Sequence, residues 1–411
     1  MRLKREKVDY SLFLVAFFIT AKGNTITVSN LTFVLGAFVT LYFFKHRGYY
    51  FDKAFVLFSI VYFLILAIYI YKFGYLDPRT GREYLKFLYA YILIKMLWDK
   101  FIPYFTQTVY ILAFISLPLY ALQLYDYDMM KFIIGFVENN VPMLDYRDGW
   151  YDNNFIFTLN DNGMFRNSGF AWEPKGFGTF LVLAIFFRLI QNSFKLADKK
   201  ILVYVIASIT SLSTATLSVI FFAIVPFYLF NKKVSYRIVY ASVLIPAIVM
   251  IFLNVEFLEK KIISEYNNRD IYVNYITDRR SDIESRSLGR FGSFLVDFMD
   301  FKKEPFVGYG NQKFERTMFS VGGVKLVRVN GLSNYMAKYG IIGLLFLFIT
   351  LSMTFRYYEK IYKFKGGIWI VFGLLMINFG SALFFTPIYL MFQFFPFVGR
   401  SKSKNLKKYI K

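Results

Sequence analysis

Apolar stretches long enough to cross a bilayer recur from residue 10 to residue 397 of this chain. The hydrocarbon core of a membrane is about 30 Å thick, and a helix of roughly 20 apolar residues spans it. Only 18% of the 411 residues are charged and 22% are aromatic, whereas soluble domains carry about 25% charge. The sequence therefore excludes an ordinary soluble domain and predicts an all-α polytopic membrane protein.

Clusters of Lys and Arg between the apolar runs divide them into twelve predicted spans. Two longer runs, 201–230 and 368–397, have basic clusters at both ends, so the preference of Lys and Arg for cytoplasmic loops predicts that each run crosses twice. Ser and Thr interrupt the first run, and Gly, Ser and Pro interrupt the second, where they break a regular helix. The predicted spans are 8–21, 26–44, 54–71, 84–98, 101–122, 170–190, 201–213, 215–230, 237–254, 332–355, 367–381 and 383–397.

The net charge of +22 comes from 49 Lys and Arg against 27 Asp and Glu. A basic balance of this size would ordinarily suggest a nucleic-acid partner. Here the basic residues gather in short segments between spans, as expected of cytoplasmic loops, so we expect no nucleic-acid partner. The first span follows a basic segment and has no small-residue cleavage site after it, which predicts an uncleaved span with the N-terminus in the cytoplasm. Twelve spans then place the C-terminus in the cytoplasm as well.

The chain has no Cys, and His46 is its only His. These two facts exclude a disulfide, an iron–sulfur site, a thiol nucleophile and a His-based metal site. The sequence also contains no nucleotide-binding P-loop and no hydrolase nucleophile elbow. We expect neither a metal nor a cofactor.

Two connecting segments are long enough to carry function, and both fall on the outer side of the predicted topology. The chain accordingly divides into five parts. These are N-terminal membrane helices (1–122), an acidic extracytoplasmic loop (123–169), central membrane helices (170–254), a large extracytoplasmic loop with an amphipathic helix (255–331), and C-terminal membrane helices with a basic cytoplasmic tail (332–411).

A charged motif joins the end of the first outer loop to the sixth span. Arg166 lies in the loop before the span, and Glu173, Pro174 and Lys175 lie where the span starts. Pro suits the first turn of a helix, and Glu beside it complements the positive end of the helix dipole. The motif therefore fits a capped helix with an interfacial Arg. It equally fits an Arg that grips an anion and a Glu that accepts a proton, because charged groups at membrane depth are expensive unless they are used.

Residues 286–301 form the second motif. At helical spacing, one face carries polar residues from Arg286 and Arg290 to Asp300, and the other carries Leu, Phe and Met. Two Arg side chains one turn apart would present donors that suit phosphate oxygens, and Arg279 and Arg280 lie just upstream. The alternative is an amphipathic helix that rests on the membrane, with its basic residues on lipid headgroups.

Two glycine-containing segments follow. In 305–311, Gly308 and Gly310 flank Tyr309 and would let the backbone approach a ligand or simply make a turn. In 334–343, Asn334 begins a stretch with two further glycines at the start of the tenth span.

The fourth span contains two lysines, Lys86 and Lys95. We expect Lys95 to extend to the cytoplasmic surface, whereas Lys86 lies near the outer end and is a weak candidate for function.

These motifs, in this order and across roughly residues 160–345, resemble those of the O-antigen polymerase and ligase superfamily. The resemblance rests on Arg-x-x-Gly-x-x-x-Glu-Pro at a middle span, an Arg-bearing helix leading to Pro-x-x-Gly-x-Gly, and Gly-x-x-Gly in the next span. It implies a GT-C-like glycosyltransferase of the cytoplasmic (inner) membrane. Such an enzyme uses undecaprenyl-diphosphate-linked oligosaccharides at the outer face, without metal, and its partners are membrane lipid, a flippase and a chain-length regulator.

The resemblance also implies roles for individual residues. Arg166 would be the arginine of the middle-loop motif, and Arg290, with Arg286 beside it, the arginine of the large loop. Glu173 is the candidate base. The remaining candidates for substrate binding are Lys175, Arg279, Arg280, Gly308, Tyr309 and Asn334.

The ligase branch carries a His in the large loop just before the following span, and residues 327–332 contain none. The departure favours a polymerase of O-antigen, capsule or exopolysaccharide over a ligase. Another lipid-linked glycosyltransferase remains an alternative, and so does a transporter such as a polysaccharide flippase. Carriers often show internal repeats and polar residues at mid-membrane, and this chain shows no repeat between its halves.

Overall fold

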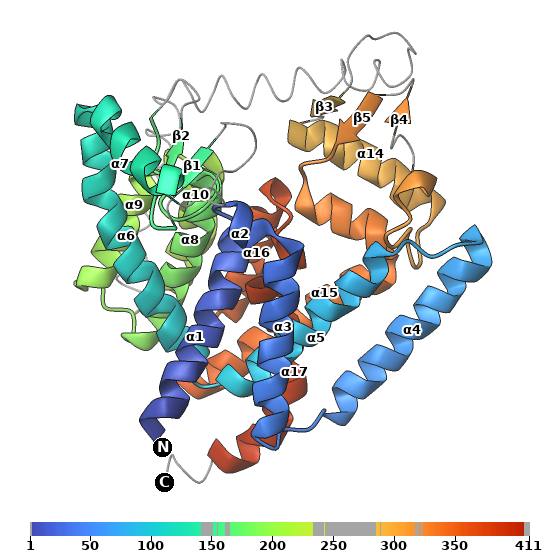
Figure 1. Ribbon diagram of the computed structural model, residues 1–411. Coiled ribbons are helices and arrows are strands. Elements are labelled where there is room, and N and C mark those ends of the chain that lie inside the picture. Colours follow the sequence, from blue (N-terminus) through green and yellow to red (C-terminus); the bar gives the residue numbers. More distant parts are fainter. Residues whose placement is uncertain are drawn as a thin grey trace.

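The computed structural model describes residues 2–140, 151–153, 155–160, 165–232, 242, 285–287, 289–316, 320–321 and 324–406. Regular structure in these ranges is overwhelmingly helical, which confirms the predicted all-α class (Figure 1). The predicted span 237–254, apart from residue 242, lies outside the described residues, as do Arg279 and Arg280.

The helices of the N-terminal half are α1 (Arg2–Ala21), α2 (Thr25–Val28), α3 (Asn30–His46), α4 (Lys53–Phe73), α5 (Arg79–Leu97), α6 (Phe101–Tyr125), α7 (Tyr127–Asn140) and α8 (Pro174–Gln191). Those that follow are α9 (Lys199–Thr210), α10 (Thr214–Val219), the π-helical turn Ile220–Ile224, α11 (Val225–Phe230), α14 (Gly289–Lys303), α15 (Gly331–Tyr362), α16 (Gly367–Gly380) and α17 (Pro387–Leu406). Short 3-10 turns occupy Lys313–Glu315 and Leu383–Phe385.

Four helices in the described part of the chain, α4, α6, α8 and α15, are long and apolar enough to cross a membrane. Shorter apolar helices occupy Thr214–Phe230, Gly367–Gly380 and Pro387–Val398. These features indicate a membrane protein, and the number of twelve crossings stays a prediction.

The two predicted helix breaks are confirmed. One lies between α9 and α10, where the Ser213 hydroxyl accepts a hydrogen bond from the Thr216 amide and caps the new helix. The other separates α16 from α17, where the Asn378 side chain accepts from the amides of Leu383 and Phe384, at 3.1 and 3.0 Å. These side chains replace the helical partners that the backbone loses at each break.

The start of α1 and the end of α17 lie at one end of the molecule, and α7, α14 and the short strands lie at the other (Figure 1). The described parts of the two predicted outer loops therefore share one end. Helix α8 is the most buried of the four long apolar helices, and α4, which stands apart from its neighbours in Figure 1, is the least buried.

The strands are very short. β1 (Tyr151–Asn153) pairs antiparallel with β2 (Thr158–Asn160). β5 (Val324–Val327) pairs antiparallel with β4 (Ser320–Val321) and parallel with β3 (Ser285–Ser287). Arg286 thus lies opposite Leu326 in a strand, and the prediction that it belongs to the amphipathic helix is wrong. The helix starts at Gly289, whose φ of 64° is not helical.

Helix α15 is broken at Gly340, which has φ 61° and ψ −161°. The segment 305–310 runs along this break and exchanges backbone hydrogen bonds with it. The amides of Tyr309 and Gly310 donate to the carbonyls of Ala337 and Lys338, at 3.2 and 2.7 Å. In return, the amides of Ile341 and Ile342 donate to the carbonyls of Pro305 and Phe306, at 2.8 and 3.2 Å. The two glycine-containing segments singled out in the sequence therefore bind each other.

Candidate functional site

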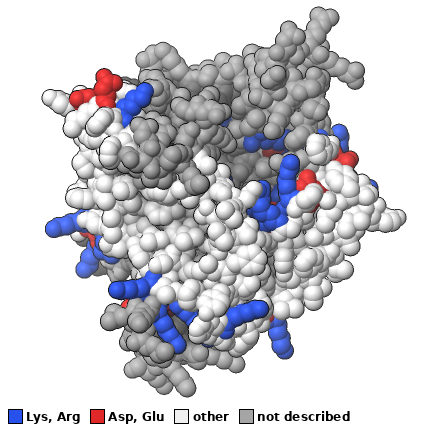
Figure 2. All heavy atoms as spheres, in the orientation of Figure 1, with Lys and Arg blue, Asp and Glu red and all other residues white. Residues whose placement is uncertain are grey.

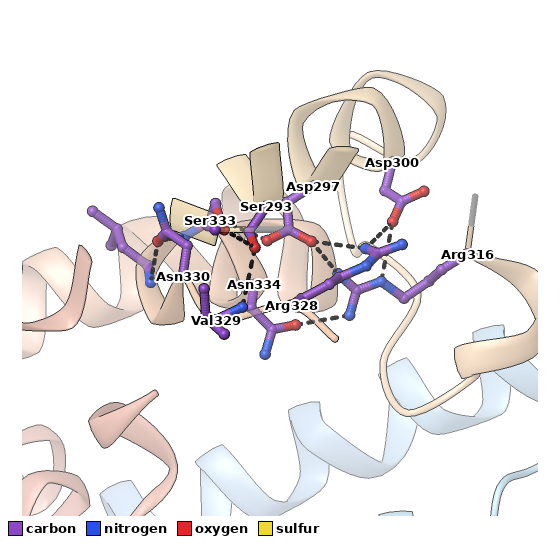
Figure 3. A network of polar contacts seen from close by, with 11 residues as sticks. Ser293, Asp297, Asp300, Arg316, Arg328, Val329, Asn330, Ser333 and Asn334 are labelled. Atoms are coloured by element: carbon purple, nitrogen blue, oxygen red, sulfur yellow. Dashed lines mark hydrogen bonds and ion pairs between the residues drawn. The ribbon is translucent and has the colours of Figure 1, made fainter. Parts of the chain in front are cut away.

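A buried cluster of two carboxylates and two arginines fixes α14 against the start of α15 (Figure 3). Arg316 donates to Asp297 at 2.7 Å and to Asp300 at 3.2 Å, and Arg328 donates to the same two carboxylates at 2.7 and 2.5 Å. The Ser333 hydroxyl donates to the second oxygen of Asp297 at 2.6 Å. Because both carboxylates are fully buried, these bonds are needed to offset their desolvation.

Burial and neighbouring charges also shift the pKa of two groups in this cluster. Burial raises the pKa of Asp297, and the nearby Arg316 and Arg328 oppose the rise. Burial lowers the pKa of Arg316, and the charge of Arg328 lowers it further. Asp297 and Arg316 therefore depend on oppositely charged neighbours to remain charged.

The predicted two-faced character of α14 is present, with the polar face inward. Ser293, Asp297 and Asp300 are buried, and the apolar residues face outward. Phe291, Phe294, Phe298 and Met299 are 36% to 43% exposed.

A cavity of about 200 Å³ lies beside this cluster, between α5, the segment 310–316, the start of α15 and α17. Figure 2 shows Lys and Arg side chains gathered at a hollow on this face of the molecule. The cavity, here called the first cationic cavity, is lined by one carboxylate, Glu83, and by five cations: Arg79, Arg82, Lys86, Arg316 and Lys338.

Glu83 is buried and uses both of its oxygens. One accepts from the Lys338 ammonium group and the Tyr339 hydroxyl, and the other accepts from the Asn311 amide at 2.7 Å. A carboxylate that accepts from three donors is held in place. Glu83 therefore fixes Lys338 at the wall of the cavity.

An apolar cavity of about 110 Å³ adjoins the first cationic cavity. It lies between α4, α5 and α15, and Phe, Tyr, Leu, Ile and Val side chains form most of its wall. Glu83, Phe87, Gly310 and Asn311 line both cavities. A charged compartment and an apolar one therefore meet at a shared wall.

A third cavity of about 210 Å³ adjoins the first cationic cavity on another side, and we call it the second cationic cavity. It lies between the ends of α1, α2 and α3, helix α5 and the segment 385–387. Its cations are Lys22, Arg82 and Lys86, and its polar neutral residues are Thr27, Asn30 and Thr386. Arg82, Lys86 and Phe385 line both cationic cavities.

Three cations of the first cationic cavity form an ion pair with a carboxylate, and two form none among the described residues. Arg316 pairs with Asp297 and Asp300, Lys338 pairs with Glu83, and Arg79 lies 3.9 Å from Asp77. Among the described residues, Arg82 bonds to the neutral Asn30 side chain. Within the same ranges, Lys86 makes no hydrogen bond and no ion pair. The two cations shared by the two cavities are thus the ones without a carboxylate partner.

The structure places one predicted substrate-binding residue in the first cationic cavity. Asn334 lines it and accepts a hydrogen bond from Arg316 at 2.8 Å. Lys175 and Arg290 come together elsewhere, around Gly380 at the end of α16. A Cβ added at Gly380 would lie 3.0 Å from Nζ of Lys175 and 3.5 Å from Nε of Arg290.

Arg166 and Glu173 line none of the three cavities. Arg166 is half-buried, and its Nε is buried without a hydrogen-bond partner among the described residues. Glu173 is the N-cap of α8 but makes no capping hydrogen bond, and Pro174 occupies the first turn as predicted. Between them, Trp172 lies beside Lys22, whose ammonium group is 6.0 Å from the ring centroid. The middle-loop motif therefore reaches the rim of the second cationic cavity through Trp172.

Gly308 and Tyr309 serve packing in this structure. A Cβ at Gly308 would lie 2.6 Å from the carbonyl oxygen of Ala337, so the close backbone approach is to α15. Tyr309 is buried, and its ring stacks on Phe73 with centroids 5.9 Å apart.

Lys95 is buried and pairs with Asp52 at 2.8 Å. The prediction that Lys95 extends to the surface is therefore wrong.

The cavity residues Arg79, Arg82 and Glu83 were missed because the predicted fourth span starts at residue 84. Helix α5 starts at Arg79 instead. Arg79, Arg82 and Lys86 are spaced three and four residues apart, and that spacing places them on one helical face. This periodicity was the available signal.

Comparison with known proteins finds no matching family model, no matching curated protein and no matching solved structure.

Proposed function

We propose that this chain is a membrane glycosyltransferase that joins polyprenyl-diphosphate-linked repeat units into a polysaccharide. The observation that carries the proposal is the shared wall between the first cationic cavity and the apolar cavity. An apolar chain with an anionic head suits this pair of compartments, because each part of the ligand meets an environment of its own polarity. The motifs that resemble the O-antigen polymerase and ligase superfamily point to the same substrate class.

The chemistry requires that a lipid diphosphate leaves the anomeric carbon of the donor sugar. Fixed cations stabilise the charge that develops on such a leaving group, and they are most effective when neighbouring groups hold them in place. Arg316 is held by two carboxylates and Lys338 by Glu83. The first cationic cavity therefore offers preorganised positive charge to a diphosphate.

The acceptor hydroxyl must lose its proton as the new bond forms. Glu83 is a poor base because three donors already occupy its oxygens. Glu173 makes no capping hydrogen bond and is the candidate base in this proposal. Arg166 and Arg290 are the arginines that the resemblance implies, and Arg290 lies with Lys175 around Gly380.

In the proposed topology, twelve helices cross the cytoplasmic membrane in a GT-C-like arrangement, and both termini face the cytoplasm. The end of the molecule that carries α7 and α14 then faces outward. The first cationic cavity is lined by the first residues of α15 and by Arg316, which pairs with α14, and a lipid-linked unit delivered to the outer leaflet would meet it there.

The test is deletion of the gene in its native host, followed by gel analysis of the surface polysaccharide. A single repeat unit on its usual carrier, with the ladder lost, supports the polymerase. Full-length polymer left on undecaprenyl diphosphate would indicate a ligase, and lipid-linked units retained inside would indicate a transporter; either result overturns the proposal.

Complementation with variants identifies the site. Arg82→Gln and Arg290→Ala should abolish the ladder at unchanged protein level. Lys302→Gln is the matched control, because Lys302 packs over the exposed Phe298 ring and lines none of the three cavities. A normal ladder with Arg82→Gln would remove the first cationic cavity from the proposal.

A further inference from the structure

The three cavities form a series with a fixed order. The apolar cavity shares Glu83 and Asn311 with the first cationic cavity, and the first cationic cavity shares Arg82 and Lys86 with the second. A ligand that enters all three must therefore place its apolar part, its first anionic group and its second anionic group in that sequence.

Charge balance points to the boundary between the two cationic cavities. Arg82 and Lys86 line both cavities, and neither has a carboxylate partner among the described residues. Arg82 is exposed and Lys86 is half-buried, so both can reach a ligand, and a cation without a carboxylate partner gains from a ligand that brings negative charge. A diphosphate carries two linked anionic groups, and it would place one on each side of Arg82 and Lys86.

The second cationic cavity has the composition of a site for a phosphate joined to a sugar. Lys22 supplies a third cation, and Thr27, Asn30 and Thr386 supply neutral groups that can bond hydroxyls. The Trp172 ring lies beside Lys22, and its backbone amide donates to the carbonyl of Ala21 at 3.3 Å. A cavity of about 210 Å³ exceeds many times the roughly 15 Å³ that one water needs, so a phosphate with part of a sugar fits.

We propose that the donor lies across the series in one direction. Its prenyl chain occupies the apolar cavity, its lipid-side phosphate the first cationic cavity, and its sugar-side phosphate and first sugar the second. Arg82 and Lys86 bridge the two phosphates. This assignment rests on the proposed function for the nature of the donor.

The direction locates the reacting bond. The bond between the anomeric carbon and the sugar-side phosphate oxygen breaks in the second cationic cavity, and the electron pair stays on the lipid diphosphate. The acceptor hydroxyl oxygen bonds to the anomeric carbon, and its proton passes to a base. Lys22, Arg82 and Lys86 then surround the phosphate on which the charge develops, in the manner of fixed donors that stabilise a leaving group.

Binding of two lipids that differ by one phosphate tests the direction. Full-length protein in nanodiscs of neutral lipid is titrated with undecaprenyl phosphate and with undecaprenyl diphosphate. Lys22→Asn removes a cation from the second cationic cavity only, and Asn tolerates the φ of 51° at this position. Arg79→Gln removes a cation from the first cationic cavity only, and Lys302→Gln is the control outside both.

We expect Lys22→Asn to weaken binding of the diphosphate about tenfold or more, the loss that corresponds to one charged hydrogen bond, and to leave the monophosphate unchanged. Arg79→Gln should weaken both lipids by similar factors. Equal losses for both lipids with Lys22→Asn, or no loss, would overturn the proposed direction. The gel test of polymerisation is independent, since an intact ladder after gene deletion would remove the polymerase while this binding pattern could still hold.

Discussion

Replacement of Gly340 by Ala should separate the segment 305–310 from α15. The φ and ψ of Gly340, 61° and −161°, lie in a region that only Gly adopts readily, and another residue is strained there by about 1 to 3 kcal/mol. A Cβ would also lie 2.3 Å from the carbonyl oxygen of Phe306 and 2.8 Å from that of Pro305. These two oxygens accept the amides of Ile342 and Ile341, and each such hydrogen bond contributes about 0.5 to 1.5 kcal/mol.

One strained residue and two lost hydrogen bonds give an expected cost of about 2 to 6 kcal/mol in total. The measurement is hydrogen exchange of segments 305–310 and 337–342 in detergent, together with the thermal midpoint of unfolding. Exchange of both segments should accelerate and the midpoint should fall. Gly135→Ala is the control, since a Cβ at Gly135 in α7 meets nothing within 4 Å. Unchanged exchange in the Gly340→Ala variant would refute the account of the broken helix.

Two further predictions concern Asp297 and Asp198, two carboxylates that pair with arginines. Asp297→Asn removes one of the two carboxylates that pair with Arg316 and Arg328. It should destabilise the protein by about 3 kcal/mol, which is the lower limit for breaking a buried pair, because Asp300 remains. A thermal midpoint equal to that of the wild type would contradict this. Partial burial raises the pKa of Asp198, but hydrogen bonds, above all from Arg188, lower it to about 2. The stabilisation from Asp198 is thus complete above its ordinary pKa and disappears as the pH falls toward 2. Asp198→Asn should therefore flatten the pH dependence of the unfolding midpoint between about pH 4 and 2. An unchanged slope would contradict the assignment.

Local chemistry in the sequence was enough to predict the helix breaks and the class. Ser213 was among the residues that predicted the first break, and it caps the new helix because short polar side chains compete for backbone donors. Asn378 does the same at the second break, but that break was predicted from its Gly, Ser and Pro residues. Pro174 begins α8 for the same kind of local reason.

The binding site was only partly predictable, because its residues come from segments that are remote in the chain. Arg316 reaches the first cationic cavity through a turn with no periodic pattern, and the sequence offers no signal for that. Lys86 was noticed, but its neighbours on α5 were assigned to a connecting loop. Gly308 was recognised as a position of close backbone approach to a ligand or of a turn, and Gly340 only as part of a motif. In the structure, the segments that contain these two glycines contact each other.

The acidic face of α14 also affects how the protein can be synthesised. Asp297 and Asp300 leave the ribosome before either of their arginines, and Arg328 follows Asp297 by 31 residues. Until Arg328 and Ser333 have been synthesised, Asp297 lacks two of the three side chains that bond to it. Helix α14 therefore acquires its full set of contacts with α15 only after the first turn of α15 has been made. In a fragment that stops before residue 328, α14 lacks these contacts, so its folded position depends on the start of the next helix.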